Sequence, residues 1–325
     1  MARLYDLPVV LWRVGPIAFA KRVWSEVNED NLLVWASALA YAWLFAVFPF
    51  FIFLLTLLPY LPQRVKTGAM DSLHNAMIQV LPGDAATTVR NNVDDIMRRR
   101  HNGLLSFGII LTLWAASGGM NMTLRAMDRC YDLPRGRPLY KERSLAILMT
   151  MITAALIVLL MVLLPVGSVV IHWIEAQHIK GISEGTLWLW NVARYLTALG
   201  LMFSLVAVVY HFGPSIRQDF RILTPGAVFT VGIWLLLEYL FRFYITRFGR
   251  YDQTYGTVGG VAILLLFFYI DAFVLLVGAE INSEIDFARG FPRGSDDFRK
   301  SAVAALKEPE SSEDDDDDTP ANPQT

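Results

Sequence analysis

The sequence has little of what disulfides, metal clusters and water-exposed surfaces require. Cys130 is the only cysteine among 325 residues, so the chain by itself forms no disulfide and no thiolate metal cluster. Charged residues make up only 18% of the chain, against 54% apolar residues. The net charge of -2 is close to neutral and says little about partners. This composition indicates a membrane protein rather than a water-soluble domain.

The usual catalytic motifs are also missing. The sequence contains no Walker A loop, no strand-borne G-x-G-x-x-G, no H-E-x-x-H and no G-x-S-x-G. Its histidines are too scattered for metal-ligand spacing: His74, His101, His172, His178 and His211. We therefore expect no catalytic residues, no bound metal and no cofactor.

Long apolar stretches are what the sequence does contain. A helix needs roughly 20 mostly apolar residues to cross a bilayer, because each backbone polar group must be satisfied within the segment. The sequence predicts an all-α membrane protein with a transmembrane domain at 32–287. Its six predicted membrane-spanning helices are 32–61, 104–124, 145–171, 187–211, 222–245 and 256–281.

The orientation follows from Lys and Arg in the short loops, which favour the cytoplasmic side. The connection between the third and fourth spans carries only Lys180, whereas the loop between the second and third carries six basic residues. Those six are Arg125, Arg129, Arg135, Arg137, Lys141 and Arg143. This asymmetry predicts a bacterial inner (plasma) membrane protein with both termini in the cytoplasm. The basic run 98–100 disagrees, but it lies in a long connection, which weighs less in the rule.

Three segments outside the spans have their own character. Residues 1–31 mix apolar and basic side chains and predict an interfacial helix on the inner surface, with no cleavable signal. The first connection, 62–103, shows helical periodicity around a Pro-Gly break and predicts two outer amphipathic helices. The segment 288–325 includes the run Asp314 to Asp318 and predicts a disordered, acidic cytoplasmic tail.

Charged residues inside the spans are the candidate functional groups, since each costs about 2.5–3.5 kcal/mol at the bilayer centre. Glu238 and Arg242 are four residues apart on one helix, and Glu238 lies at about the depth of Arg194. Two interpretations remain open. Glu238 and Arg194 form a structural pair while Arg242 reaches outward, or the three line a polar cavity that opens to the outside.

Asp271 lies about midway along the last span, with no charge one turn away. Tyr41 lies at a comparable depth in the first span, so its hydroxyl is the simplest hydrogen-bond partner for this carboxyl. The alternative is a proton or cation relay. Tyr41, Arg194, Glu238, Arg242 and Asp271 together form the predicted polar path or buried network.

Several short blocks occur in a specific order across residues 24–287. They include Tyr41 and Pro49 in the first span, Trp114 with Ser117 and Gly118 in the second, and Tyr255, Gly256, Glu280 and Asn282 in the last. In this arrangement the chain resembles the YihY/BrkB family of membrane proteins, also described as virulence factor BrkB and, in older usage, as ribonuclease BN.

The resemblance implies a six-helix inner-membrane protein with a role in envelope integrity or in export of envelope components. If the family shares one site, we expect it at Tyr41, Tyr255, Gly256 and Glu280. Asp271 departs from the small or neutral residue usual there, so it is a poor candidate for a shared mechanism. A metal-dependent nuclease needs a His and Asp cluster around its water, and the sequence has none, so we expect no ribonuclease activity.

The leading functional prediction is transport or flipping of a lipid, an envelope component or a small solute. The alternative is a non-transporting membrane scaffold for envelope assembly, and an intramembrane enzyme is the weakest hypothesis. A cavity reaching Glu238 or Asp271 would favour transport, and a solid core would favour the scaffold. We expect the lipid bilayer and a lipid or envelope precursor as partners and no nucleic acid. The sequence does not determine whether the protein forms a homo-oligomer or which ion is coupled to transport.

Overall fold

The computed structural model describes residue 4 and residues 6–57, 102–133, 137–176, 184–216, 218–248 and 252–290. This part of the chain is entirely helical and contains no strand, which confirms the predicted all-α class. The helices are α1 (Asp6–Val14), α2 (Pro16–Glu29), α3 (Leu32–Leu57), α6 (Asn102–Cys130), α7 (Leu139–Ala176), α8 (Glu184–Phe212), α9 (Pro225–Phe248) and α10 (Asp252–Ala288).

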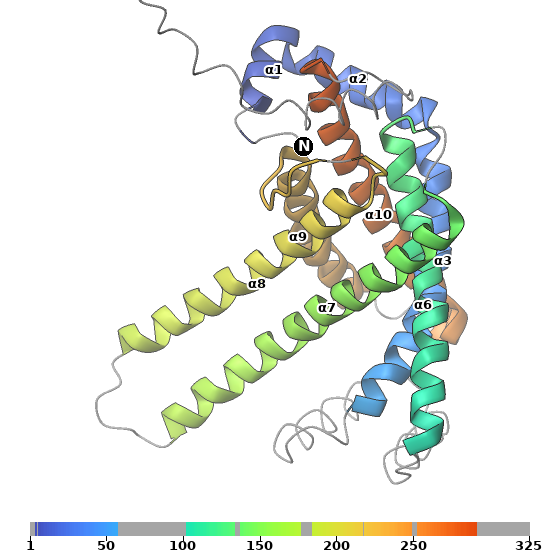
Figure 1. Ribbon diagram of the computed structural model, residues 1–325. Helices are drawn as coiled ribbons and strands as arrows, with labels where there is room; N and C mark the ends of the chain where they lie inside the picture. Colours follow the sequence, from blue (N-terminus) through green and yellow to red (C-terminus); the bar gives the residue numbers. More distant parts are fainter. Residues whose placement is uncertain are drawn as a thin grey trace, which may run out of the picture.

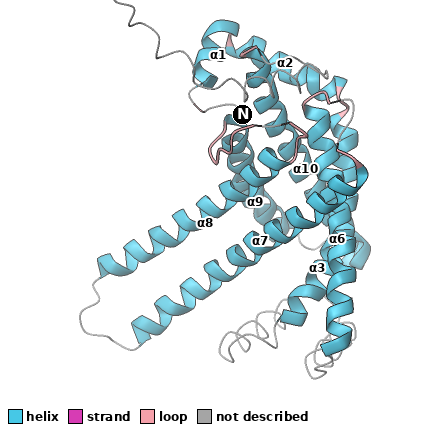
Figure 2. Cartoon of the chain, in the orientation of Figure 1, coloured by secondary structure: helices cyan, strands magenta, loops and turns pink. Residues whose placement is uncertain are grey.

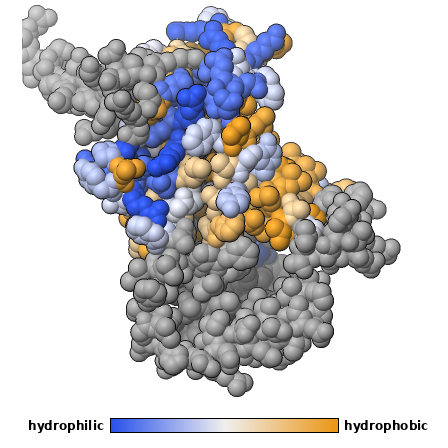
Figure 3. All heavy atoms as spheres, turned by 90° about the vertical axis from the view of Figure 1, so that its right-hand side faces the viewer, coloured by the Kyte–Doolittle hydropathy of each residue, from blue (hydrophilic) through white to orange (hydrophobic). Residues whose placement is uncertain are grey.

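Several helices have the length and composition to cross a membrane. Within the described residues, four segments qualify, namely Leu139–Leu163, Trp188–Phe212, Pro225–Phe243 and Gly259–Ala288. A fifth arises if Pro16–Glu29 and Leu32–Val47, which meet at 62°, are counted as one broken span. The molecular surface agrees, since a hydrophilic end carrying α1 and α2 gives way to a hydrophobic zone (Figure 3).

The N-terminal segment forms two helices instead of the single interfacial helix expected within residues 1–31. Gly15 interrupts it with φ 85°, and Pro16 follows at the start of α2. Proline lacks the backbone N–H that would continue α1, and glycine adopts positive φ without a steric cost. An ion pair of 3.0 Å between Arg289 and Asp6 ties α1 to the end of α10. The predicted outer helices at 62–103 and the acidic tail beyond residue 290 lie outside the described residues.

The helices pack most closely at one end of the molecule, called here the α2 end, where α1, α2 and the C-terminus of α10 lie (Figure 1). α3 packs against both α6 and α10, and α10 packs against α9. From that end α7 and α8 run out together and lean away from α3 and α6 (Figure 2). The main apolar core accordingly lies at the α2 end, around Leu32, Met127, Tyr210 and Leu276.

Candidate functional site

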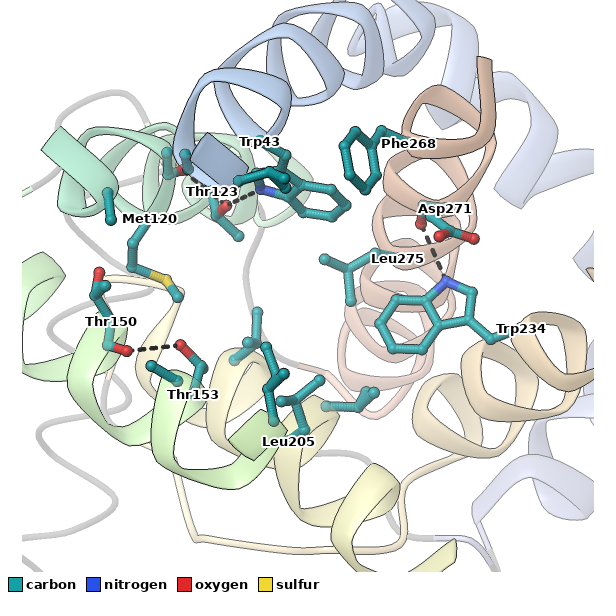
Figure 4. A pocket seen from close by; sticks show the side chains of 18 residues that line it. Trp43, Met120, Thr123, Thr150, Thr153, Leu205, Trp234, Phe268, Asp271 and Leu275 are labelled. Carbon is teal, nitrogen blue, oxygen red and sulfur yellow. Dashed lines mark hydrogen bonds between the residues drawn. The ribbon is translucent and has the colours of Figure 1, made fainter. Parts of the chain in front are cut away.

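A central cavity of about 390 Å³ lies where the α7–α8 pair diverges from the other helices, and it is lined by α3, α6, α7, α8, α9 and α10 (Figure 4). Small side chains create part of this space, including Ala46, Ala116 and Ala154. Gly119 lies where α6 meets α3, and a Cβ there would make an ordinary van der Waals contact of 3.4 Å with the Ala42 carbonyl oxygen. The volume falls within the range of pockets that hold small ligands.

Most polar groups in the cavity wall are already hydrogen-bonded. Trp43 donates its indole N–H to Thr123 Oγ1 at 3.3 Å, and Thr153 donates its hydroxyl to the Met149 carbonyl at 2.8 Å. Trp234 donates to the backbone carbonyl of Asp271 at 3.2 Å, beside the Asp271 side chain (Figure 4). The cavity therefore presents a mainly apolar wall with one carboxyl group at its edge.

A buried hydrogen-bond network closes the bundle between this cavity and the α2 end. Tyr210 of α8 donates to the Leu275 carbonyl of α10 at 2.8 Å and lies 2.6 Å from the hydroxyl of Thr230 on α9. Asn282 accepts a hydrogen bond from the Gly226 N–H at 2.9 Å and donates to Thr224 at 3.1 Å. Three helices are thus joined on one side of the cavity.

Gly226 and Gly278 allow α9 and α10 to come this close. A Cβ on Gly226 would overlap the carbonyl oxygen of Gly278, and a Cβ on Gly278 would overlap the side chains of Thr230 and Tyr210. Such small residues let helix backbones meet within a membrane protein. Sequence reasoning missed this contact, because glycines are also common in helices that make none.

A second polar network joins the loops at the same end. The Asp128 carboxylate accepts hydrogen bonds from the backbone N–H and the hydroxyl of Ser215, at 2.6 and 2.8 Å. Arg137 donates to the three successive carbonyls of residues 212–214 at the end of α8. Burial raises the pKa of Asp128 although the Ser215 hydrogen bonds oppose it, and burial lowers the pKa of Arg137. The charge rule had counted Arg137 only as an orientation signal.

Acidic side chains are buried near the same end. Glu280 is 1% exposed, and Ser283 donates to one of its oxygens at 3.2 Å. Asp30, in the turn between α2 and α3, is 3% exposed and pairs with Arg129 at 3.1 Å. Burial outweighs the attraction of Arg129 and raises the pKa of Asp30 to about 7. Sequence reasoning identified Glu280 and missed Asp30, which looked like an ordinary residue at a helix end.

The structure separates the residues of the predicted polar path. Asp271 lines the cavity. Tyr41 is 62% exposed, and its ring packs 4.7 Å from that of Phe45. Glu238 and Arg242 are exposed. The guanidinium of Arg194 lies 4.9 Å from the ring centre of Tyr195, the next residue. Of these five residues, all in the described chain, Asp271 alone lies in the cavity wall.

Some positions of the family motif are buried between helices, and others are exposed at the surface. Trp114 is 57% exposed, and the guanidinium of Arg143 lies 4.1 Å from its ring centre. Ser117 is fully buried and donates to the Trp114 carbonyl at 2.8 Å, whereas a Cβ on Gly118 would meet nothing within 4 Å. Asn282 belongs to the α9–α10 network. The side chains of Pro49, Tyr255 and Gly256 lie outside the described residues.

Comparison with known proteins places these features in a family context. The family described as "Virulence factor BrkB" matches residues 23–302. The ribonuclease-like protein YfkH of Bacillus subtilis is 31% identical over 276 residues, which cover 85% of this chain and 98% of that protein.

More distant relatives are longer than the segment they share with this chain. A UPF0761 membrane protein of Xanthomonas axonopodis is 25% identical over 286 residues, or 86% of this chain and 64% of that protein. A similar protein of Stenotrophomonas maltophilia is 25% identical over 274 residues, or 62% of its length. The chain thus spans less than two thirds of these two relatives. No solved structure matches the chain significantly.

Proposed function

Since the chain belongs to the virulence factor BrkB family of membrane proteins, we propose that it moves a lipid or another amphiphilic envelope component across the bacterial inner membrane. In this proposal the protein spans the membrane six times, with α3, α6, α7, α8, α9 and α10. Both termini are cytoplasmic, so the α2 end faces the cytoplasm. The six Lys and Arg residues within 125–143, where α6 ends and α7 begins, support this orientation.

The observation that carries the proposal is the central cavity. Every one of the six long helices contributes to its wall, and it reaches Asp271 near the middle of α10. A scaffold needs no such space. A path for a substrate requires one. The cavity therefore favours transport over the scaffold hypothesis.

The lining restricts the class of substrate. The wall is formed mostly by Ala, Val, Leu, Ile, Phe and Trp side chains, with threonines bonded to their own helices. A small hydrophilic solute would lose its hydration there without gaining hydrogen bonds. A hydrocarbon chain has no hydrogen-bonding groups to satisfy, so it can move from the bilayer to an apolar wall without that cost. We therefore favour a lipid or lipid-linked precursor, and we propose no enzymatic step and no ribonuclease activity.

The proposal is tested with the full chain reconstituted in liposomes that contain a phospholipid with a fluorescent headgroup. An impermeant reductant bleaches the outer leaflet, and further bleaching reports lipid movement. Ala154→Trp fills the cavity, whereas Ala155→Trp puts the same bulk on the exposed side of α7. We expect Ala154→Trp to slow the movement about tenfold, as a loss of about 1.4 kcal/mol would do. Ala155→Trp should match the wild type.

Two results would contradict transport of this lipid class. One is bleaching by the wild type no faster than in protein-free liposomes. The other is an equal rate for the two tryptophan variants, because movement would then not pass through the cavity. Both variants need to show the monodisperse elution of the wild type in detergent.

A further inference from the structure

A second apolar groove lies between α2, α9 and α10, outside the central cavity. Its volume is about 300 Å³, and its walls are entirely apolar. They are formed by Phe19, Val23 and Trp24 of α2, by Phe229 of α9, and by Phe273 and Val277 of α10, among others. On α10, Asp271 and Leu275 line the cavity, whereas Phe273 and Val277 line the groove. The two spaces share no residue.

Large apolar side chains around this groove are exposed. Trp24 is 60% exposed at its rim, and Ile17, about two turns earlier on α2, is 74% exposed. Trp12 on α1 is 88% exposed. No described part of the chain covers them. Tryptophan rings favour the boundary between lipid headgroups and acyl chains, so a bilayer is the surface that fits this side of α1 and α2.

The charge on the same two helices selects the headgroup. Lys21 and Arg22 are exposed. On the helical wheel Lys21 lies beside Trp24 at the rim of the groove, whereas Arg22 lies on the opposite side of α2 from Trp24. Arg13 is exposed at the end of α1. The acidic residues of α2 lie farther along, where Glu26 is buried and Glu29 is exposed near its C-terminus. Lysine and arginine side chains at a membrane surface attract anionic lipids.

We propose that the groove between α2, α9 and α10 binds an acyl chain of an anionic phospholipid from the adjacent leaflet, with the headgroup against Lys21. The apolar walls contact the hydrocarbon, and the Lys21 ammonium group contacts the phosphate. Because the groove shares no residue with the central cavity, this lipid site does not depend on transport through that cavity.

The test uses the full chain in nanodiscs containing phosphatidylglycerol with a photoreactive group on one acyl chain. After irradiation, labelled peptides are identified and quantified by mass spectrometry. Ala20→Trp occupies the groove, and Ala18→Trp is its matched control on the far side of the same helix. Both positions are exposed, so neither change disturbs the core. We expect Ala20→Trp to reduce labelling of the α2 and α10 groove peptides about tenfold, because the indole occupies the space of the acyl chain. Ala18→Trp should retain wild-type labelling.

The headgroup is tested with phosphatidylcholine that carries the same acyl chain. Wild-type protein should label more with phosphatidylglycerol, and Lys21→Gln should label equally with both lipids. Arg22→Gln, on the opposite side of α2, is the control and should keep the wild-type preference. Equal groove labelling in Ala20→Trp and Ala18→Trp would overturn the acyl-chain site, and so would crosslinks there to a second copy of the chain. Equal wild-type labelling by the two lipids would overturn the headgroup assignment.

The groove and the cavity can fail separately in these experiments. Ala154→Trp should leave the groove labelling unchanged while it slows lipid movement in liposomes. If lipid movement is absent but the labelling pattern holds, the lipid site remains and the transport proposal fails. If lipid movement depends on Ala154 but the groove peptides are not labelled, the transport proposal stands and the groove lipid site fails.

Discussion

Tyr210 of α8 donates its hydroxyl proton to the Leu275 carbonyl of α10 at 2.8 Å, and its oxygen lies 2.6 Å from the Thr230 hydroxyl of α9. One fully buried side chain thereby joins three helices directly beside the central cavity. Valine residues 206 and 209 of the same helix line the cavity. Movement of α8 relative to α9 and α10 would have to break these hydrogen bonds.

Tyr210→Phe should destabilise the protein by about 1–3 kcal/mol, because it leaves the buried Leu275 carbonyl and the Thr230 hydroxyl without their partner. The measurement is unfolding of the purified chain in a mild detergent. Tyr239→Phe is the control, since Tyr239 is 69% exposed on α9. Tyr210→Phe combined with Thr230→Val should cost less than the sum of the single changes. Additive losses would show that the two hydroxyls act independently.

Gly226→Ala should prevent α9 and α10 from reaching their observed separation, because the new methyl would overlap the Gly278 carbonyl. We expect aggregation or early elution in size-exclusion chromatography. Gly232→Ala is the matched control on α9, where a Cβ meets nothing within 4 Å. Alanine is favoured over glycine in a helix by about 0.5–1 kcal/mol, so this control should be at least as stable as the wild type. Normal elution of Gly226→Ala would show that the contact is not required.

Asp30 should make stability depend on pH. Its pKa in the folded protein is raised from 3.8 to about 7, chiefly by burial. Folding therefore favours the protonated carboxyl. The stability that this group contributes is complete below about pH 4 and is lost as the pH rises through about 7. Melting temperatures of the wild type and Asp30→Asn, measured from pH 4 to 8, should diverge in that direction. The wild type should lose stability relative to the variant as the pH increases.

Glu29→Gln serves as the control for this pH dependence, since Glu29 is the exposed neighbour at the end of α2. Its melting profile should follow that of the wild type across the range. Parallel profiles for the wild type and Asp30→Asn would mean that Asp30 titrates alike in the folded and unfolded chain.

Single cysteines on a Cys130→Ser background should report which predicted residues reach water. Cys130 is buried, and its thiol lies 3.7 Å from the Leu276 carbonyl, so the serine keeps a donor there. Asp271→Cys should react with an impermeant thiol reagent because the residue lines the cavity. Glu280→Cys should react slowly from either side, since Glu280 is 1% exposed. An unreactive cysteine at 271 would mean that the cavity is sealed from water.

The coarse architecture could be predicted from the sequence because it depends on properties that add along the chain. Apolar length predicts membrane helices, since backbone groups in lipid must be satisfied within their own segment. That rule identified the all-α class and located the long helices. It also led to Asp271, because a charge in an apolar run is visible without knowing its neighbours.

The pairing of polar side chains between helices could not be predicted in the same way. Glu238 was expected either to pair with Arg194 while Arg242 reached outward, or to line a polar cavity with both. In the structure Glu238 and Arg242 are exposed. Asp128 was not singled out in the sequence, and its carboxylate accepts hydrogen bonds from Ser215, which lies 87 positions away. Helix periodicity says which residues share a face but leaves open which helix that face meets.

What the sequence determined by itself is the class of the protein, the approximate position of its helices and its family, because hydropathy, charge and motif order are local. The tertiary structure alone decided where the cavity lies, how Gly226 and Gly278 join α9 to α10, and which buried polar groups pair. Those features arise from the angles at which helices cross, and crossing angles depend on side-chain contacts between segments far apart in the chain.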